Sequence, residues 1–354
     1  MALQLAIGDR APEVLGATAS GRFFSLDGQA GRPALLVTLG GLEPDAAALV
    51  LDRLRAARAE LAAAGVDAVP IAPALMPFTT RFADDPQAGD ELVYATGGDL
   101  AAFSLGGAAA AILIDRGGRI VELLAFDGAA DLTGLLARSA PRLASEPARL
   151  RTSAAPALIV PNLASPALCR ALIDHFEASP HAAGVMASFS DGGAYAKLDE
   201  SKKRRRDTEL TAESPLYAEV LDLLSARVIP EIKRAFQVDI ANADRILIAR
   251  YDDTGGYFKR HRDNSAPHTA FREFAISLNL NTGDYEGGEL LFPEYDDARY
   301  SPPAGGAIVF SAALLHEAAP VTRGSRYVLL SFLGSAAAQA RLTAWIESQK
   351  AIAS

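Results

Sequence analysis

The sequence predicts two domains of different class, an α/β domain followed by an α+β domain whose strands form a barrel or sandwich with helices outside. The chain has 354 residues, which is too long for one typical hydrophobic core. Its first part alternates strand-like with helix-like segments, as α/β domains do. From Asp244 onward, short runs alternate apolar and polar residues between turn-forming Gly, Asn, Asp and Pro, a pattern typical of β barrels and sandwiches.

The N-terminal domain is expected to contain a strand, a helix, a strand, a hairpin and a closing helix. The two single strands are short apolar runs, and the first helix has a Pro near its start and a Gly at its end. An Arg-Gly-Gly-Arg turn between two apolar runs indicates the hairpin. In order, the segments are Arg32–Gly40, Glu43–Gly65, Val66–Pro73, Ala109–Phe126 and 129–144.

A linker is expected between the two domains, because the stretch Ser145–Pro156 has the composition of a loop. We therefore expect domains over residues 1–145 and 156–340, joined by a linker over residues 146–155. The second domain should begin with a strand and a helix that starts at Ser-Pro. A second long helix is expected over Ser214–Gln237.

Composition narrows the classes of partner and compartment. The formal net charge of −9 argues against a nucleic-acid or anionic-membrane partner. The single cysteine, Cys169, excludes an intrachain disulfide and a Cys-rich zinc site, which fits a cytoplasmic location. The N-terminus lacks the basic start and apolar run of a signal peptide, and no apolar stretch is long enough to predict a membrane span.

One predicted strand of the second domain carries a histidine and an aspartate two residues apart. If Gly256–Asp263 is a strand, His261 and Asp263 point to the same side and can bind one metal ion together. A second histidine would complete a 2-His-1-carboxylate triad, which leaves open positions on a non-haem Fe(II). The candidates for this third ligand are His175, His181, His268 and His316.

His316 is the preferred third ligand, because it follows an apolar strand that could lie beside the first pair. Farther along, Arg326 opens a strand on which it shares an otherwise apolar face with Val328 and Leu330. An arginine on such a face is costly unless it pairs with an anion, and its planar guanidinium suits a carboxylate. Arg323 is the alternative anchor. A metal triad beside an inward cation is what a 2-oxoglutarate-dependent Fe(II) oxygenase requires.

At these residues the chain resembles the prolyl 4-hydroxylase-like branch of the 2-oxoglutarate/Fe(II) dioxygenases, over about residues 155–335. The resemblance implies a double-stranded β-helix, or jelly roll, with His261, Asp263 and His316 as iron ligands. It implies that Arg326 holds the distal carboxylate of 2-oxoglutarate and that Tyr251 contacts the same cosubstrate. The segments that carry the resemblance are Pro156–Phe176, Arg250–Asp263, Gly287–Tyr295 and Pro302–Leu333.

The N-terminal domain resembles a peroxiredoxin, which implies a thioredoxin-like fold. The similar elements are its opening, "IGDRAPEVLGATASGRFFSLDGQAGRPALLVTL", and its hairpin, "AAAILIDRGGRIV". The peroxidatic cysteine of the family is missing, because "GGLEPDAAALV" stands where the cysteine belongs. Without a thiolate, neither peroxide reduction nor disulfide exchange is possible there. We expect a redox-inactive domain that binds a partner or substrate.

The resulting expectation is an enzyme, an Fe(II)- and 2-oxoglutarate-dependent dioxygenase that hydroxylates a C–H bond and releases succinate and CO2. O2 is the cosubstrate, and ascorbate stays open as an accessory reductant. The resemblance favours a peptidyl substrate, such as a prolyl residue, while a free amino acid or small metabolite stays open. The alternative is a non-catalytic binding module or an iron- or oxygen-sensing module. A homo-oligomer and a protein partner bound through the N-terminal domain are the remaining partner hypotheses.

Five consecutive basic residues, Lys202–Arg206, have three interpretations. They could form a solvated loop or face, which is the usual fate of such a run. They could also lie at the rim of the cleft and hold an acidic substrate or partner. Nucleic-acid binding is the third interpretation, and the net negative charge argues against it.

Overall fold

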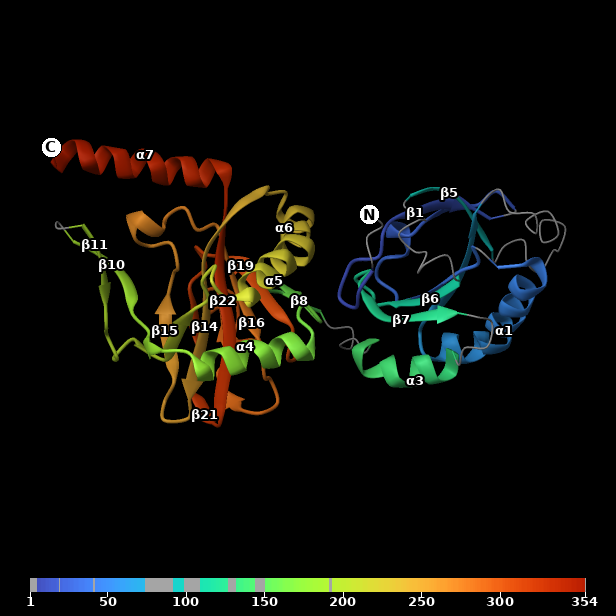
Figure 1. Ribbon diagram of the computed structural model, residues 1–354, viewed down its shortest axis with the longest axis horizontal. Coiled ribbons are helices and arrows are strands. Elements are labelled where there is room, and N and C mark those ends of the chain that lie inside the picture. The colour runs from blue at the N-terminus through green and yellow to red at the C-terminus, as the bar shows by residue number, and fades with distance from the viewer. Residues whose placement is uncertain are drawn as a thin grey trace. The chain divides into compact units, whose positions relative to one another are not determined.

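Figure 1 shows a computed structural model of the chain, which describes residues 5–18, 20–40, 42–73, 92–98, 109–126, 132–143, 150–190 and 193–353. By its internal contacts the chain divides into two compact units, Met1–Ala148 and Arg149–Ser354. Of the predicted linker, residues 146–149 lie outside the described residues, and residues 150–155 have neither helix nor strand.

The first unit is built on one seven-stranded sheet with the order β2-β1-β5-β4-β3-β6-β7. Strands β3, β4 and β5 run parallel, whereas β6 and β7 form an antiparallel hairpin beside β3. The strands are β1 (Val14–Ala17), β2 (Phe23–Ser25), β3 (Ala34–Thr38), β4 (Asp67–Pro73), β5 (Val93–Gly98), β6 (Ala109–Ile114) and β7 (Ile120–Phe126). The helices are η1 (Asp27–Gln29), α1 (Pro44–Ala63) and α3 (Leu132–Leu143).

Both faces of this sheet are covered, which explains why its central strands are continuous apolar runs. All residues of β3 and β6 are buried, and apolar clusters lie on either side of the sheet. The predicted strand, helix, strand, hairpin and closing helix correspond to β3, α1, β4, β6–β7 and α3. Strands β1, β2 and β5 were not predicted from the sequence, because they are short or contain glycine.

The second unit is β-rich and resembles a jelly roll. Its larger sheet has the order β8-β19-β16-β22-β14-β13-β9, and its smaller sheet has the order β12-β15-β20-β18. The strands of the larger sheet are β8 (Ala157–Val160), β9 (Ala182–Ala183), β13 (Arg206–Glu209), β14 (Ile240–Asp252), β16 (Phe274–Asn279), β19 (Ala307–Ser311) and β22 (Ser325–Ser335). Those of the smaller sheet are β12 (Lys203–Arg204), β15 (Tyr257–His261), β18 (Leu290–Leu291) and β20 (His316–Ala318).

Two separate apolar clusters hold this unit together, one on each face of the larger sheet. The first packs the sheet against the helices between residues 166 and 236, of which α4 (Pro166–Ala178) crosses in front of the sheet in Figure 1. The second lies between the two sheets and joins residues such as Phe310 and Val328 to Leu290 and Ala318. The remaining elements are α4 (Pro166–Ala178), β10 (Met186–Ser190), β11 (Gly193–Lys197), α5 (Pro215–Leu223), η3 (Leu224–Val228), α6 (Ile229–Phe236), η4 (Pro267–Thr269), β17 (Glu286–Gly287), β21 (Val321–Arg323) and α7 (Ala336–Ala353).

The long helix predicted over Ser214–Gln237 is interrupted. A π-helical turn, Leu224–Val228, separates α5 from α6. Pro230, the second residue of α6, lies two positions beyond this turn, and because proline has no N–H it cannot donate a helical hydrogen bond there. Among the described residues, no helix is both long enough and apolar enough to cross a bilayer.

The core between α4 and the larger sheet can be tested at Phe176, which is fully buried. Its ring stacks on His181, with 4.7 Å between centroids, and meets the ring of Tyr327 edge-on at 5.7 Å. We expect Phe176→Ala to lower the free energy of unfolding of this unit by about 3–5 kcal/mol, because it leaves a cavity. Urea unfolding followed by the fluorescence of Trp345, the single tryptophan, measures this in the second unit.

Ile159→Ala is the matched control, because this side chain is 53% exposed on β8. It should change the free energy of unfolding by less than about 0.5 kcal/mol. Equal effects of the two substitutions would contradict the assignment of Phe176 to the core.

Candidate metal centre

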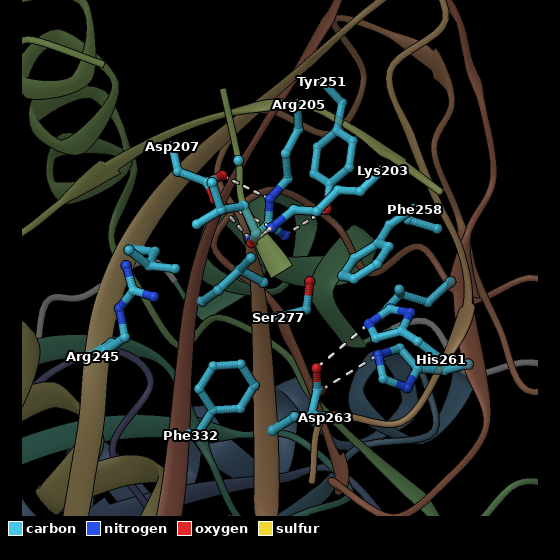
Figure 2. Close-up of a pocket in the computed structure, with 18 of the residues that line it drawn as sticks. Lys203, Arg205, Asp207, Arg245, Tyr251, Phe258, His261, Asp263, Ser277 and Phe332 are labelled. Atoms are coloured by element: carbon cyan, nitrogen blue, oxygen red, sulfur yellow. Dashed lines mark hydrogen bonds and ion pairs between the residues drawn. The ribbon is translucent and has the colours of Figure 1, made fainter. Parts of the chain in front are cut away.

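Two neighbouring strands bring the three predicted ligands together. His261 ends β15 and His316 begins β20, and the two residues are directly paired in the antiparallel register. The carboxylate of Asp263 lies between them, with Oδ1 3.4 Å from His261 Nε2 and Oδ2 3.5 Å from His316 Nε2. One potential ligand atom from each residue lies within 4.8 Å of the others, and Figure 2 shows His261 and Asp263 facing each other.

The other predicted third ligands do not join this cluster. His175 lies on α4, and His181 follows that helix and stacks on Phe176. His268 lies in the short helix η4. Of the four histidines that the sequence offered, the structure therefore brings only His316 to the pair.

The local backbone differs from the regular strand that the sequence argument assumed. The pairing of β15 with β20 shifts between Phe258 and His261, and the ring of Phe258 stacks on that of His261 with 3.4 Å between centroids. Asp263 lies just past the end of β15, where its N–H donates to the carbonyl of Ala312 at 2.9 Å. The convergence thus depends on this bulge and on the cross-strand pairing, and not on strand alternation alone.

Backbone carbonyls orient both imidazoles. His261 Nδ1 lies 2.7 Å from the carbonyl oxygen of Lys259, and His316 Nδ1 lies 3.0 Å from that of Leu314. When Nδ1–H donates to a carbonyl, Nε2 keeps its lone pair and can bind a metal. Both Nε2 atoms face Asp263, so the three donors point to one place.

The electrostatics give the donors the protonation states that a metal requires. Burial lowers the pKa of His316 to about 4, so this imidazole is neutral at neutral pH. Burial by itself would raise the pKa of Asp263, but His316, His261 and Arg272 together hold it at about 2. The site therefore presents an ionised carboxylate beside a neutral imidazole, the forms in which these groups bind metals.

A bidentate ion pair, which was not predicted from the sequence, links the two chain segments that carry the predicted metal ligands. Arg262, between the first two ligands, donates from NH1 and NH2 to the carboxylate of Glu294 at 3.0 and 2.5 Å, and also to the carbonyl of Ala313. Glu294 in turn accepts the N–H of Leu315 at 3.1 Å. Arg262, which follows β15, and Leu315, which precedes β20, therefore both donate hydrogen bonds to the carboxylate of Glu294.

The three donors line a cavity of about 550 Å³, which also contains Tyr251 and Arg326. Arg326 on β22 is 2% exposed and lies directly opposite Tyr251 of β14 in the register, with its guanidinium carbon 5.3 Å from the centroid of the tyrosine ring. Apolar side chains such as Phe310 and Phe332 form other parts of the wall. The cavity therefore combines a metal-binding end with a buried cation.

The guanidinium of Arg326 is incompletely satisfied by protein. Its NH2 donates to Asn279 Oδ1 at 3.0 Å and to Ser277 Oγ at 3.3 Å, whereas its buried Nε has no hydrogen-bond partner. Within the described part of the chain it forms no ion pair. An uncompensated buried cation is costly, so this arrangement fits an anionic ligand such as a carboxylate.

Arg323, the alternative anchor, lies elsewhere. Its side chain is 69% exposed and forms an ion pair with Glu286 at 2.7 Å. It does not line the cavity. Arg326 is therefore the only one of the two arginines that faces the metal-binding cluster.

A second polar cluster, which was not predicted from the sequence, lies on the cavity wall. Arg205 donates to the hydroxyl of Tyr251 at 2.8 Å, and its Nε lies 2.7 Å from Asp207 Oδ1. Lys203 donates to the carbonyl of Val185 at 2.8 Å and lies 3.5 Å from the same aspartate. Burial lowers the pKa of Lys203 to about 7. The basic run Lys202–Arg206 thus contributes Lys202, Lys203 and Arg205 to the cavity wall, and because all five of its residues are basic, no pattern in the sequence marked these three.

Comparison with known proteins matches residues 246–334 to the 2OG-Fe(II) oxygenase superfamily. This stretch contains the three clustered donors, Tyr251 and Arg326. The chain is 32% identical over 157 residues to a PKHD-type hydroxylase of Picosynechococcus, covering 42% of this chain and 68% of that protein. It is 33% identical over 93 residues to a PKHD-type hydroxylase of Maricaulis maris, covering 26% of this chain and 42% of that protein.

Two solved structures are also similar. A viral collagen prolyl hydroxylase from Paramecium Bursaria Chlorella virus-1 is 18% identical with a TM-score of 0.38, covering 51% of this chain and 96% of that one. A prolyl-4-hydroxylase from Pseudomonas putida is 17% identical with a TM-score of 0.39, covering 51% of this chain and 93% of that one.

Metal binding can be measured without turnover. We expect the wild-type chain to bind one equivalent of Mn(II), detected by loss of the electron paramagnetic resonance signal of the free ion. Asp263→Ala removes the only anionic donor of the three. Its affinity for Mn(II) should therefore fall by more than the roughly 10- to 100-fold that follows the loss of a residue that only hydrogen-bonds a metal ligand.

His268→Ala serves as the control, because His268 is a histidine of the same unit outside the cluster. Its affinity for Mn(II) should equal that of the wild type. Unchanged binding by Asp263→Ala, or an equal loss in His268→Ala, would contradict the assignment.

Proposed function

Because the chain belongs to the PKHD-type hydroxylases of the 2OG-Fe(II) oxygenase superfamily, we propose that it hydroxylates a C–H bond of a peptide or protein substrate. The enzyme is a 2-oxoglutarate-dependent dioxygenase that uses Fe(II), 2-oxoglutarate and O2. The observation that carries the proposal is the meeting of His261, Asp263 and His316 in a cavity that also holds a buried guanidinium.

In this proposal the two imidazoles and the carboxylate hold the iron. When bound, the iron couples the oxidative decarboxylation of 2-oxoglutarate by O2 to hydroxylation of the substrate, which yields succinate and CO2. The chain contributes geometry: Nδ1–carbonyl hydrogen bonds fix His261 and His316, and the bidentate pair of Arg262 with Glu294 keeps their segments in place. Phe258 and Phe310 shield the donors from water.

We assign Arg326 and Tyr251 to the distal carboxylate of 2-oxoglutarate. The buried Nε of Arg326 lacks a partner, and a carboxylate would satisfy it together with the remaining N–H groups. Tyr251 already accepts a hydrogen bond from Arg205, so its own hydroxyl hydrogen is left to donate to another acceptor.

Similar proteins that are prolyl or lysyl hydroxylases support a peptidyl substrate, with a prolyl residue as one candidate. These include the two prolyl hydroxylases described above and a procollagen lysine hydroxylase of Rattus norvegicus, which is 39% identical over 71 residues. That match covers 19% of this chain and 10% of the rat protein.

For the first unit we propose a thioredoxin-like domain without redox function. The parallel strands β3, β4 and β5 beside the antiparallel hairpin β6–β7 support this fold. The only cysteine, Cys169, belongs to the second unit, and burial raises the pKa of its thiol to about 11. This unit would then serve to bind a partner or a second copy, and a single buried thiol is compatible with the cytoplasm.

The iron assignment predicts the effect of ligand substitution on turnover. His261→Ala and Asp263→Ala should each abolish iron-dependent formation of succinate from 2-oxoglutarate, because each removes one donor from the triad. Circular dichroism and Trp345 fluorescence should remain those of the folded wild type. Full turnover in either variant would refute the assignment, and a non-catalytic binding module would show no iron-dependent succinate even as wild type.

The anchor assignment predicts a selective effect on the cosubstrate. Arg326→Ala should raise the Michaelis constant for 2-oxoglutarate by about 10- to 100-fold, which corresponds to the loss of charge-assisted hydrogen bonds. Arg323→Ala is the control, because this exposed arginine lies outside the cavity. If the Michaelis constant for 2-oxoglutarate were unchanged in Arg326→Ala but raised in Arg323→Ala, the carboxylate anchor would be Arg323 and not Arg326.

A further inference from the structure

The basic run Lys202–Arg206 is divided between the cavity and the surface. Lys202, Lys203 and Arg205 line the cavity, whereas Arg204 and Arg206 do not. The two outer arginines are exposed and donate to backbone carbonyls away from it, of Thr254 at 2.9 Å and of His181 at 3.0 Å. The run therefore supplies specific positions of the cavity wall and is more than a solvated face.

A further lysine faces this run across the smaller sheet. β12 pairs with β15 so that Lys203 lies opposite Phe258, and the N–H of Lys259 donates to the carbonyl of Lys202 at 2.9 Å. Lys202 and Lys259 are thus cross-strand neighbours, and like charges in such positions repel. Both side chains are exposed, both line the cavity, and neither forms an ion pair among the described residues.

Cations outnumber carboxylates in the cavity, although the whole chain has a net charge of −9. Eight lysines and arginines line it, against three carboxylates. The cations are Lys202, Lys203, Arg205, Arg245, Lys259, Arg260, Arg272 and Arg326, and the carboxylates are Asp207, Glu209 and Asp263.

Several of these cations already have partners. Three arginines pair with one carboxylate each, at 3.3, 3.4 and 2.7 Å, in the pairs Arg245–Glu209, Arg260–Glu317 and Arg272–Asp244. Arg326 is assigned to the cosubstrate. What remains is a basic wall of four residues, Lys202, Lys203, Arg205 and Lys259, in which Lys203 and Arg205 share the carboxylate of Asp207. This wall has unsatisfied positive charge on the side of the cavity.

The basic wall is one aromatic ring away from the metal-binding cluster. Lys203 Nζ lies 5.1 Å from the centroid of the Phe258 ring, and the Arg205 guanidinium lies 5.8 Å from it. The same ring stacks on His261. Figure 2 shows Lys203, Arg205 and Phe258 on the side of the cavity that leads to His261. A ligand whose reacting atom lies at the metal would reach this wall with a neighbouring group.

We propose that the basic wall recognises carboxylates of the substrate, and that the substrate is an acidic peptide segment with Asp or Glu beside the hydroxylated residue. This inference rests on the proposed hydroxylase function. The wall has cations at two depths, Lys203 and Arg205 buried inside and Lys202 and Lys259 exposed outside. A ligand that meets both must extend from the cavity into solvent, which fits a peptide better than a small metabolite.

Binding is tested without turnover, with Mn(II) in place of iron and 2-oxoglutarate present. Three fluorescent peptides of equal length carry a central proline flanked by Glu, by Gln or by Lys. Fluorescence anisotropy should show that the Glu peptide binds about tenfold more tightly than the Gln peptide, and that added salt removes the difference. Equal dissociation constants for the Glu and Gln peptides would overturn the inference. So would a single-stranded oligonucleotide of matched charge that binds more tightly.

Charge-reversal variants test which residues of the wall recognise the acidic peptide. The double variant Lys202→Glu/Lys259→Glu should bind the Glu peptide about tenfold more weakly and the Lys peptide more tightly than the wild type does. Arg204→Glu/Arg206→Glu is the matched control, because it also reverses two charges, at exposed residues of the same run that lie outside the cavity. It should keep the preference of the wild type. An equal loss in this control would show that net charge, and not the wall, is responsible.

Two further measurements separate this inference from the proposed function. Mn(II) affinity should be unchanged in the single variant Lys202→Glu, because Lys202 supplies neither a metal donor nor a carbonyl that orients one. Iron-dependent succinate formation tests the hydroxylase function by itself. If succinate forms but the peptides bind equally, the acidic substrate is wrong and the function stands. If the Glu peptide is preferred but no succinate ever forms, the wall is a binding site and the hydroxylase function is wrong.

Discussion

The pairing of β15 with β20 is the constraint on which the site depends. It sets His261 directly opposite His316 and leaves the carboxylate of Asp263 within 3.5 Å of both Nε2 atoms. A shift of one residue in this register would turn one imidazole to the other face of the sheet. Arg262 and Glu294 hold the register from outside, since their bidentate pair joins the segment after β15 to the segment before β20.

Charged side chains also lie next to one another along the cavity wall, on either side of Tyr251. Arg326 and Arg205 lie on Tyr251 at 5.3 and 5.6 Å from its ring centroid, so the tyrosine contacts one guanidinium assigned to the cosubstrate and one that belongs to the basic wall. Arg205 is itself held by Asp207. The sides of the cavity proposed for the cosubstrate and for the substrate therefore share contacts with one aromatic side chain.

Much of the second unit could be predicted because the sequence patterns that indicate it lie within single strands. Arg326 stands on an otherwise apolar strand, and that strand is β22, where the residue is 2% exposed. The bulge at Phe258 and the pair of Arg262 with Glu294 could not be predicted, because they depend on which strands become neighbours. The same holds for Lys202–Arg206, three of whose residues line the cavity because β12 lies beside β15. In the first unit, the strands with continuous apolar runs were predicted and the short β1, β2 and β5 were not.

The two units differ in what their buried residues imply. The sheet of the first unit is covered on both faces by apolar clusters, and stability alone explains such a core even where the thiol chemistry of the resembled family is absent. The second unit instead buries Arg326, which has no carboxylate partner among the described residues, Asp263 between two imidazoles, and Lys203, whose pKa burial lowers to about 7. Apolar residues of similar size at these positions would stabilise the fold more. Because stability does not explain these buried polar groups, they fit a cavity that binds charged ligands.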